Sequence, residues 1–202
     1  MRAHEIVSES LIDQYNKEQR EGREDAIFSM CRPFLQQIKN QYRTQVVWRG
    51  TYEHAFGEKY FDGMWLYRTN RHRTPRDVNP ALHSYIDDYF FKKFGKRYRS
   101  QAAFGSGEPG VAVNYGDPYV FMPVGDFAFC WSPVLDDLIE HEDDLLDAIP
   151  HNPTIDQIAA VMDRFRYTET NLVHAIRSGH EIMFDCQSYF LIDPKVINVP
   201  IR

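Results

Sequence analysis

QVVWRGT, at residues 45–51, is the stretch of sequence on which our interpretation of the fold depends. Its VVW run is β-branched and aromatic, which predicts a short strand that ends at Gly50. Arg49 is unusual at this place, because arginine is almost never fully buried unless it is paired. Its planar guanidinium can bind phosphate or carboxylate oxygens bidentately. The stretch therefore predicts either a cation at the floor of a cleft or an exposed arginine at a strand end.

The composition is that of an ordinary globular chain. A sequence of 202 residues, 43% of them hydrophobic and 26% charged, is long enough to build a core without disulfides. The net charge of -6 argues against broad electrostatic docking on nucleic acid. The 3 cysteines form no CxxC pair, which argues against a disulfide framework or a cysteine zinc site. No run resembles a signal peptide or a membrane span, so we expect a cytoplasmic protein with no membrane partner.

Helix-like and strand-like segments follow one another irregularly, which predicts an α+β fold. Residues 1–44 are expected to form a helical lead-in, with a helix over residues 3–30 that breaks near Gly22 and a second helix that starts near Pro33. Residues 45–192 are expected to form the core, a split, mixed sheet of short strands around a cleft. No linker or repeat divides the chain, so we predict one domain and leave its oligomeric state open.

The core segments follow from hydrophobic periodicity and turn residues. Strands are expected at residues 46–49, 100–107, 119–123, 126–131 and 181–192, the last with a bend at 186–188, and residues 63–67 are expected to form an edge strand or a buried turn. Helices are expected at residues 80–94, 134–149, 155–166 and 169–177. Asn79 and Gly95 should cap the first of these helices, and Thr154 should cap the third.

Two charged segments allow more than one interpretation. The loop at residues 68–77 carries four arginines, with Pro75 inside it and Pro80 shortly after it. It predicts either a contact for phosphates or an acidic partner, or a solvated loop whose arginines pair with nearby carboxylates. The acidic run at residues 140–147 lacks the HExxH spacing of a zinc site and predicts a solvated helix face. We therefore expect no bound metal.

Three polar residues stand at the ends of strand-like runs: Arg49, Ser106 and Glu181. Pockets often form where strand ends meet, so these side chains are candidates for one site. A structural interpretation stands beside each of them. Glu181 could be a surface residue at a strand start, and Ser106 could be a turn residue between two glycines.

The order of these three residues resembles the R-S-E triad of the ADP-ribosyltransferase superfamily. FGS at residues 104–106, followed by VNYG at residues 113–116, resembles the second motif of that superfamily. Residues 45–192 are also similar to small bacteriophage-encoded proteins of this type. The resemblance implies an NAD-type cleft and transfer of ADP-ribose from NAD, as substrate, to a protein or nucleic acid. It also implies a host cytoplasmic location if the chain is phage-encoded.

The resemblance also implies roles for individual residues. Glu181 would stabilise the oxocarbenium-like transition state, Arg49 would hold NAD, and Ser106 would orient both. Tyr115 or a neighbouring aromatic residue would stack the nicotinamide ring. The cofactor-binding residues implied in this way are Arg49, Gly50, Thr51, Phe104, Ser106 and Tyr115.

The sequence departs from the family pattern at two places. Gly179 stands two residues before Glu181, where members that modify arginine carry Glu or Gln, which weighs against an arginine acceptor. The second motif lacks a full Ser-Thr-Ser, and Ser100 is an alternative match to its serine. Two other functions therefore remain open. One is a non-catalytic binding protein or inhibitor that uses the acidic run or the arginine loop, and the other is a nucleotide or phosphate sensor.

Overall fold

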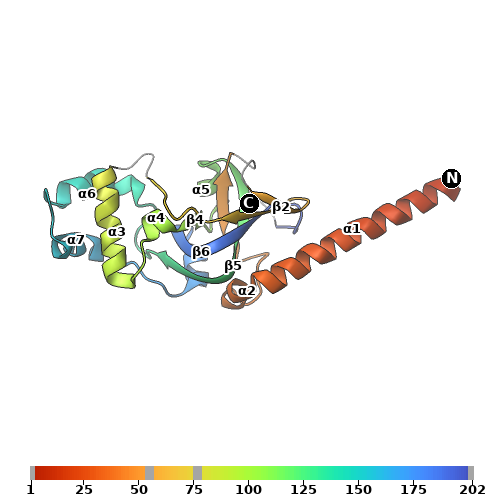
Figure 1. Ribbon diagram of the computed structural model, residues 1–202, viewed down its shortest axis with the longest axis horizontal. Coiled ribbons are helices and arrows are strands. Elements are labelled where there is room, and N and C mark those ends of the chain that lie inside the picture. Colours follow the sequence, from red (N-terminus) through yellow and green to blue (C-terminus); the bar gives the residue numbers. More distant parts are fainter. Residues whose placement is uncertain (1–2, 53–56, 75–78, 200–202) are drawn as a thin grey trace.

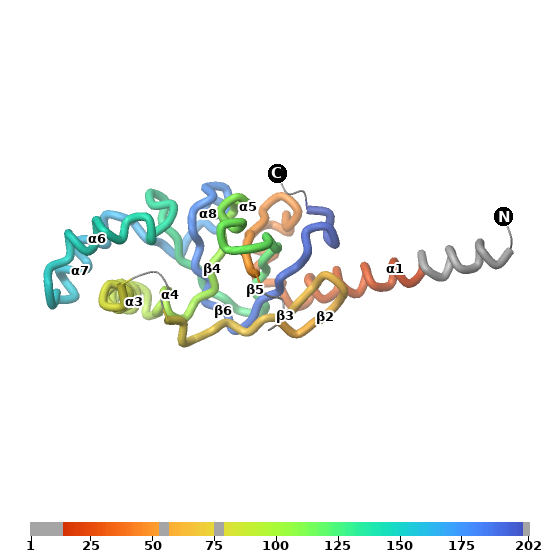
Figure 2. Tube along the Cα trace, turned by 90° about the horizontal axis from the view of Figure 1, so that it is seen from above, coloured from red at the N-terminus to blue at the C-terminus, as the bar shows by residue number. Residues whose placement is uncertain are grey.

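The computed structural model describes residues 3–52, 57–74 and 79–199, and it describes the side chains of the first helix from Gln14 onwards. A small β-barrel lies at the centre of the molecule. Several helices gather at one end of it, and the long helix α1 (Ala3–Met30) projects from the other end (Figures 1 and 2). No helix among the described residues has the length and apolar character needed to cross a membrane.

Four strands close the barrel. They are β1 (Trp48–Thr51), β4 (Ala103–Ser106), β5 (Asp117–Trp131) and β6 (Glu181–Ile192). Their pairings run from β1 to β5, β6, β4 and back to β1, and every one of them is antiparallel. The α+β class is thus confirmed. The expected split, mixed sheet is wrong, because β5 and β6 pair along most of their lengths and close a single sheet on itself.

A hairpin extends the sheet beyond the barrel. It consists of β2 (Glu58–Phe61) and β3 (Met64–Arg68), and β3 pairs with the C-terminal half of β6. The strand predicted at residues 63–67 is confirmed with a shift of one residue. It is not an edge strand, because it has a partner on each side.

The two strands expected at residues 119–123 and 126–131 are one strand, β5. Its pairing with β6 moves from Val124 opposite Ser188 to Phe127 opposite Cys186, so β5 carries one additional residue at a bulge. Gly125 occupies this bulge with φ +68°, a conformation that glycine adopts without steric cost. The bend expected at residues 186–188 is absent from β6, because the partner strand takes up the irregularity.

Buried apolar side chains form two clusters. The first joins the barrel strands to α2 (Arg32–Gln37) and α8 (Leu172–Ser178). The second lies between the sheet and helices that include α3 (Pro80–Phe94) and α7 (Ile155–Met162). Met183 and Phe184 are neighbours in β6 but belong to different clusters, because successive strand residues point to opposite faces.

The helix α1 continues through Gly22, where a break was expected. A glycine inside a helix costs only about 1 kcal/mol relative to alanine, and the neighbouring charged residues are good helix formers. A Cβ atom at position 22 would lie 3.2 Å from the ring of Phe61, so the glycine also lets the hairpin approach the helix. The next helix, α2, has Pro33 in its first turn, as the sequence predicts.

Local patterns predict other helices less accurately. The helix expected at residues 134–149 is only η1 (Ile139–His141) followed by α6 (Glu142–Ala148). Two further short helices are α4 (Tyr98–Gln101), whose last two residues fall in the strand expected at residues 100–107, and α5 (Pro109–Val113). The helix predicted after Thr154 is confirmed as α7, with a capping box, and ends in the 3₁₀ turn η2 (Asp163–Phe165).

Both predicted caps of α3 are confirmed. The side chain of Asn79 accepts hydrogen bonds from the backbone N–H groups of Ala81 and Leu82, and Gly95 ends the helix with φ +72°. Replacing Asn79 by alanine should lower the free energy of unfolding by about 1 kcal/mol, because two N–H groups lose their acceptor. Urea denaturation measures this change. Asn79→Ser should retain most of the stability, and equal stability of the alanine variant would contradict the capping role.

Candidate functional site

A pocket of about 190 Å³ lies where β1, β4 and β6 meet. Its polar and charged lining comes from these strands, from the loop after β3, and from the segments that follow α5 and β5. These lining residues are Arg49, Arg73, Ser106, Tyr115, Asp137 and Glu181. The residues Arg49, Ser106 and Glu181, singled out from the sequence, therefore share one pocket.

The strand register explains this convergence. Trp48 in β1 pairs with Ser106 in β4, and Ser106 pairs in turn with Glu181 in β6. The start of β1, the end of β4 and the start of β6 thus lie at the same height in the barrel. Arg49 is the residue that follows Trp48 in β1. Gly50, Phe104 and Tyr115 also line the pocket, whereas Thr51 is not among the lining residues.

Gly50 does not end the strand, as the sequence suggested, but lies inside β1. A Cβ atom on this residue would lie 1.9 Å from the backbone oxygen of Ala112, so only glycine permits this approach. The close contact holds α5 against β1 and brings Tyr115 to the wall of the pocket.

The guanidinium of Arg49 is held without being neutralised. Its Nη1 donates a hydrogen bond of 2.6 Å to the backbone oxygen of Phe104, and its Cζ lies 5.5 Å from the centre of the Tyr189 ring. Among the described residues, no carboxylate lies within ion-pair distance of it. The side chain therefore offers an oriented cation with donors left for a ligand.

The carboxylate of Glu181 is bound by a second arginine. Its Oε1 accepts a hydrogen bond of 2.8 Å from Nη1 of Arg99, whose side chain is only 5% exposed. The backbone N–H of Arg99 donates to Asp87, which anchors the short helix α4 on α3. Burial raises the pKa of Glu181, Arg99 opposes this shift, and the carboxylate of Asp137 adds to it.

The side chain of Ser106 forms no hydrogen bond with Arg49 or Glu181. Its hydroxyl donates to the backbone oxygen of Gly179 and accepts from the N–H of Glu108. Any influence on Glu181 therefore passes through the backbone two residues before it. The orienting contact that the resemblance implied for this serine is made to Glu181 by Arg99 instead. Ser100, the alternative serine, does not line the pocket.

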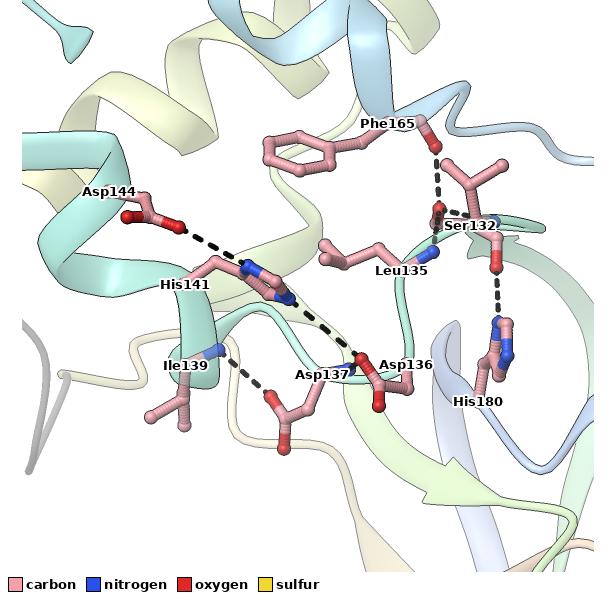
Figure 3. A network of polar contacts seen from close by, with 10 residues as sticks. Ser132, Leu135, Asp136, Asp137, Ile139, His141, Asp144, Phe165 and His180 are labelled. Carbon is pink, nitrogen blue, oxygen red and sulfur yellow. Dashed lines mark hydrogen bonds and ion pairs between the residues drawn. The ribbon is translucent and has the colours of Figure 1, made fainter.

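Another part of the pocket lining comes from the segment after β5. The hydroxyl of Ser132 donates to the backbone oxygen of Phe165 and accepts from the N–H of Leu135, which fixes the start of the segment (Figure 3). Further along, the N–H of Ile139 donates to Oδ1 of Asp137 (Figure 3). The segment is thus rigidly folded without being helical, and it presents Asp137 to the pocket.

Tyr115 and Asp137 both line the pocket and are joined by a hydrogen bond. The Tyr115 hydroxyl donates to Oδ2 of Asp137 over 3.3 Å. Burial and the nearby carboxylates, first Asp137 and then Glu181, raise the pKa of Tyr115 to about 12. Its ring, which is half exposed, remains neutral at physiological pH and is free to stack on a planar ligand.

His180 is adjacent to Glu181 in the sequence but lies outside the pocket lining. Its Nδ1 is 2.9 Å from the backbone oxygen of Ser132 (Figure 3). Because a carbonyl oxygen only accepts, this nitrogen carries the hydrogen. The ring therefore ties the start of β6 to the segment after β5.

The arginine loop fits neither of its two interpretations completely. Arg71 forms an ion pair with Asp185, as expected for a paired loop. Arg73 instead reaches the pocket, where its Cζ lies 4.1 Å from the centre of the Phe104 ring. Arg68 is exposed, and Arg76 lies outside the described residues.

The acidic run lies on and beside α6. His141 is 3.9 Å from Asp136 and 3.8 Å from Asp144 (Figure 3). Within residues 3–52, 57–74 and 79–199, no group of three or more His, Cys, Asp or Glu side chains is placed to hold a metal ion.

Comparison with known proteins adds no relative. No protein-family model matches the chain, and no curated protein or solved structure is significantly similar to it. A functional assignment must therefore rest on the chemistry of the pocket.

Proposed function

We propose that the chain is an ADP-ribosyltransferase that binds the nicotinamide end of NAD in this pocket. The observation that carries the proposal is the convergence of Arg49, Ser106 and Glu181 in one hollow, with the Tyr115 ring beside them. The volume of about 190 Å³ is below the range of about 300–1,000 Å³ common for ligand pockets. The pocket would thus enclose only part of the dinucleotide and leave the rest at the surface.

The chemistry requires few proton transfers. The bond between ribose C1′ and the nicotinamide nitrogen breaks with its electron pair on nitrogen, so the cationic ring leaves as a neutral molecule. The ribose becomes oxocarbenium-like and is captured by a nucleophile of the acceptor, which then loses a proton. A fixed carboxylate beside the ribose stabilises the positive charge as it develops.

Glu181 is placed to supply this carboxylate. Arg99 bonds its Oε1, and no described residue forms a hydrogen bond with its Oε2, which can accept one from a ribose hydroxyl. Arg99 also favours the ionised form of the carboxyl group against the effect of burial. An oriented carboxylate in its ionised form is what this transition state needs.

The direct test is incubation of the purified chain with NAD labelled in its adenylate part, together with cell protein and nucleic acid. We expect release of nicotinamide and transfer of label to a macromolecule. If nicotinamide is released without transfer, the acceptor is water. Absence of release in the presence of bacterial, phage and eukaryotic extracts would contradict the proposal.

A nucleotide sensor is the second candidate, and the ion pair between Arg99 and Glu181 favours it. This pair engages Oε1 of the carboxylate that the transferase chemistry would need beside the ribose. A sensor would show an increased melting temperature with NAD, through ligand binding to the folded state, but no turnover. A binding protein that uses its arginine loop is less supported, because Arg71 and Arg73 both make internal contacts.

The pH dependence of the proposed activity should respond to Asp137. Glu181 must be ionised, so the rate should fall as the pH drops through its pKa, which burial and Asp137 raise. Asp137→Asn removes one negative charge and should lower this pKa, so the acid limb of kcat against pH should move to lower pH. Asp147→Asn, an exposed change of equal charge, should leave the limb in place. A limb that does not move in Asp137→Asn would contradict the assignment of Glu181 as the titrating group.

A further inference from the structure

We propose that Arg73 and Arg49 together form a binding site for a diphosphate group. The identification of that group as the pyrophosphate of NAD rests on the proposed function. The site itself rests on the positions and charges of the two arginines. No part of the family resemblance assigns a role to Arg73.

Both arginines contact the same residue of the pocket wall. Arg49 donates to the backbone oxygen of Phe104, while the Cζ of Arg73 lies 4.1 Å from the centre of its ring. Arg49 comes from β1, and Arg73 comes from the loop after β3. Two guanidinium groups from separate segments are thus gathered around one side chain at the edge of the pocket.

The charges at this wall are not balanced. Arg99 is also close, with its Cζ 4.9 Å from the centre of the Phe104 ring, but its charge is matched by Glu181. Among the described residues, neither Arg49 nor Arg73 has a carboxylate within ion-pair distance. Although Arg73 is exposed as a whole residue, desolvation of its guanidinium, and then the nearby Arg99 and Arg49, lower its pKa to about 10, so it remains a cation at neutral pH. An anion bound at this wall would relieve the repulsion among the three cations.

The loop that carries Arg73 is fastened at two points. The backbone N–H of Arg73 donates to the backbone oxygen of Ser100 over 3.0 Å. Two residues earlier, Arg71 pairs with Asp185 and donates to the backbone oxygen of Cys186. Because its backbone is held on both β6 and α4, Arg73 needs little ordering when a ligand binds.

A diphosphate suits these two side chains better than a single carboxylate does. Each guanidinium offers a planar pair of donors, and two such pairs match oxygens on two adjacent phosphoryl groups. The carboxylates in the pocket do not oppose this placement strongly. Glu181 is paired with Arg99, and Asp137 accepts a hydrogen bond from Tyr115.

The test is isothermal titration calorimetry with inorganic pyrophosphate and with ADP-ribose, without divalent cations. Arg73→Gln should weaken binding of both ligands about 10- to 100-fold, because a charge-assisted contact is lost. Arg73→Lys keeps the charge but not the planar pair of donors. Its affinity for both ligands should lie between those of Arg73→Gln and wild type. Arg68→Gln is the matched control, because it removes the same charge from an exposed residue of the same segment.

The outcomes separate this inference from the proposed function. If pyrophosphate binds through Arg73 but NAD is never turned over, the diphosphate site stands and the proposed activity is wrong. If NAD is turned over but Arg73→Gln binds ADP-ribose like wild type, the inference is wrong and the activity stands. Wild type that binds neither ligand, or an equal loss in Arg68→Gln, would also overturn the inference.

Discussion

Replacing Glu181 by glutamine should lower the rate of nicotinamide release from NAD about 10²–10³-fold, the usual cost of removing one electrostatic group from a transition state. The loss should fall on kcat. The charge of the oxocarbenium-like species develops only during bond breaking, so ground-state binding of NAD should change little. Glutamine keeps an oxygen that can accept the hydrogen bond from Arg99, so the pocket should keep its shape.

A matched control variant is available at the start of another strand. Glu58 begins β2, is exposed, and lies outside the pocket. Glu58→Gln changes the net charge by the same amount and should leave kcat within about twofold of wild type, since exposed substitutions have small effects. Single-turnover kinetics and NAD titration measure the two variants side by side. A kcat for Glu181→Gln within threefold of wild type would remove this residue from the mechanism.

The parts of the structure that could be predicted from sequence depend on local chemistry. The caps of α3 follow from the types of Asn79, Pro80 and Gly95, because each satisfies or ends a helix through neighbouring backbone groups. Strand-forming residues likewise placed Arg49, Ser106 and Glu181 at or near strand ends. Their meeting in one pocket could be suggested only by the general rule that pockets form at strand ends and by the family resemblance, because the pairings between the strands are long-range.

The residues that sequence analysis missed are defined by distant partners. Arg99 was one of several cations after α3, and nothing local distinguishes it from Lys96 or Arg97. Arg99 is separated from Glu181 by 82 positions in the sequence. The hydrogen bond from its backbone N–H to Asp87 anchors α4 on α3 and so places Arg99 beside Glu181. Arg73 shared its loop with three similar arginines, and only the folded loop shows which one lines the pocket.

Tertiary contacts also overrode periodicity. The acidic segment from residue 134 has helical spacing, yet its first residues are irregular. The hydroxyl of Ser132 accepts hydrogen bonds from the backbone N–H groups of Val134 and Leu135, which competes with helix formation. The same contacts lead the chain to Asp137 at the pocket wall. The closed barrel escaped prediction for a related reason, since the pairing of β5 with β6 spans a bulge that no local pattern specifies.

The second large effect is expected from Gly107, the residue after Ser106. A Cβ atom on Gly107 would lie 1.6 Å from the backbone oxygen of Ile176 at the end of α8. No side-chain rotation relieves a clash with backbone, so Gly107→Ala must push α8 away from β4. We expect the free energy of unfolding to fall by about 3 kcal/mol or more, at the upper end of the usual cost of overpacking.

The same displacement should reach the site. The next residues after α8 are Gly179, which accepts from Ser106, and then His180 and Glu181. Moving the end of α8 would therefore shift the carboxylate relative to Arg49, and a shift of about 1 Å can cost about 10²-fold in rate. We expect the folded fraction of Gly107→Ala to release nicotinamide far more slowly than wild type does.

Gly110, three residues along, is the control for this prediction. The nearest atom to a Cβ atom there is 3.7 Å away, on the side chain of Glu108, and the residue lies inside α5. Gly110→Ala should therefore change stability by less than about 1 kcal/mol, with a helical alanine favoured over glycine. Urea denaturation of both variants gives the comparison. If the two alanine variants proved equally stable, α8 could not rest on β4 as described, and the placement of Glu181 would lose its structural support.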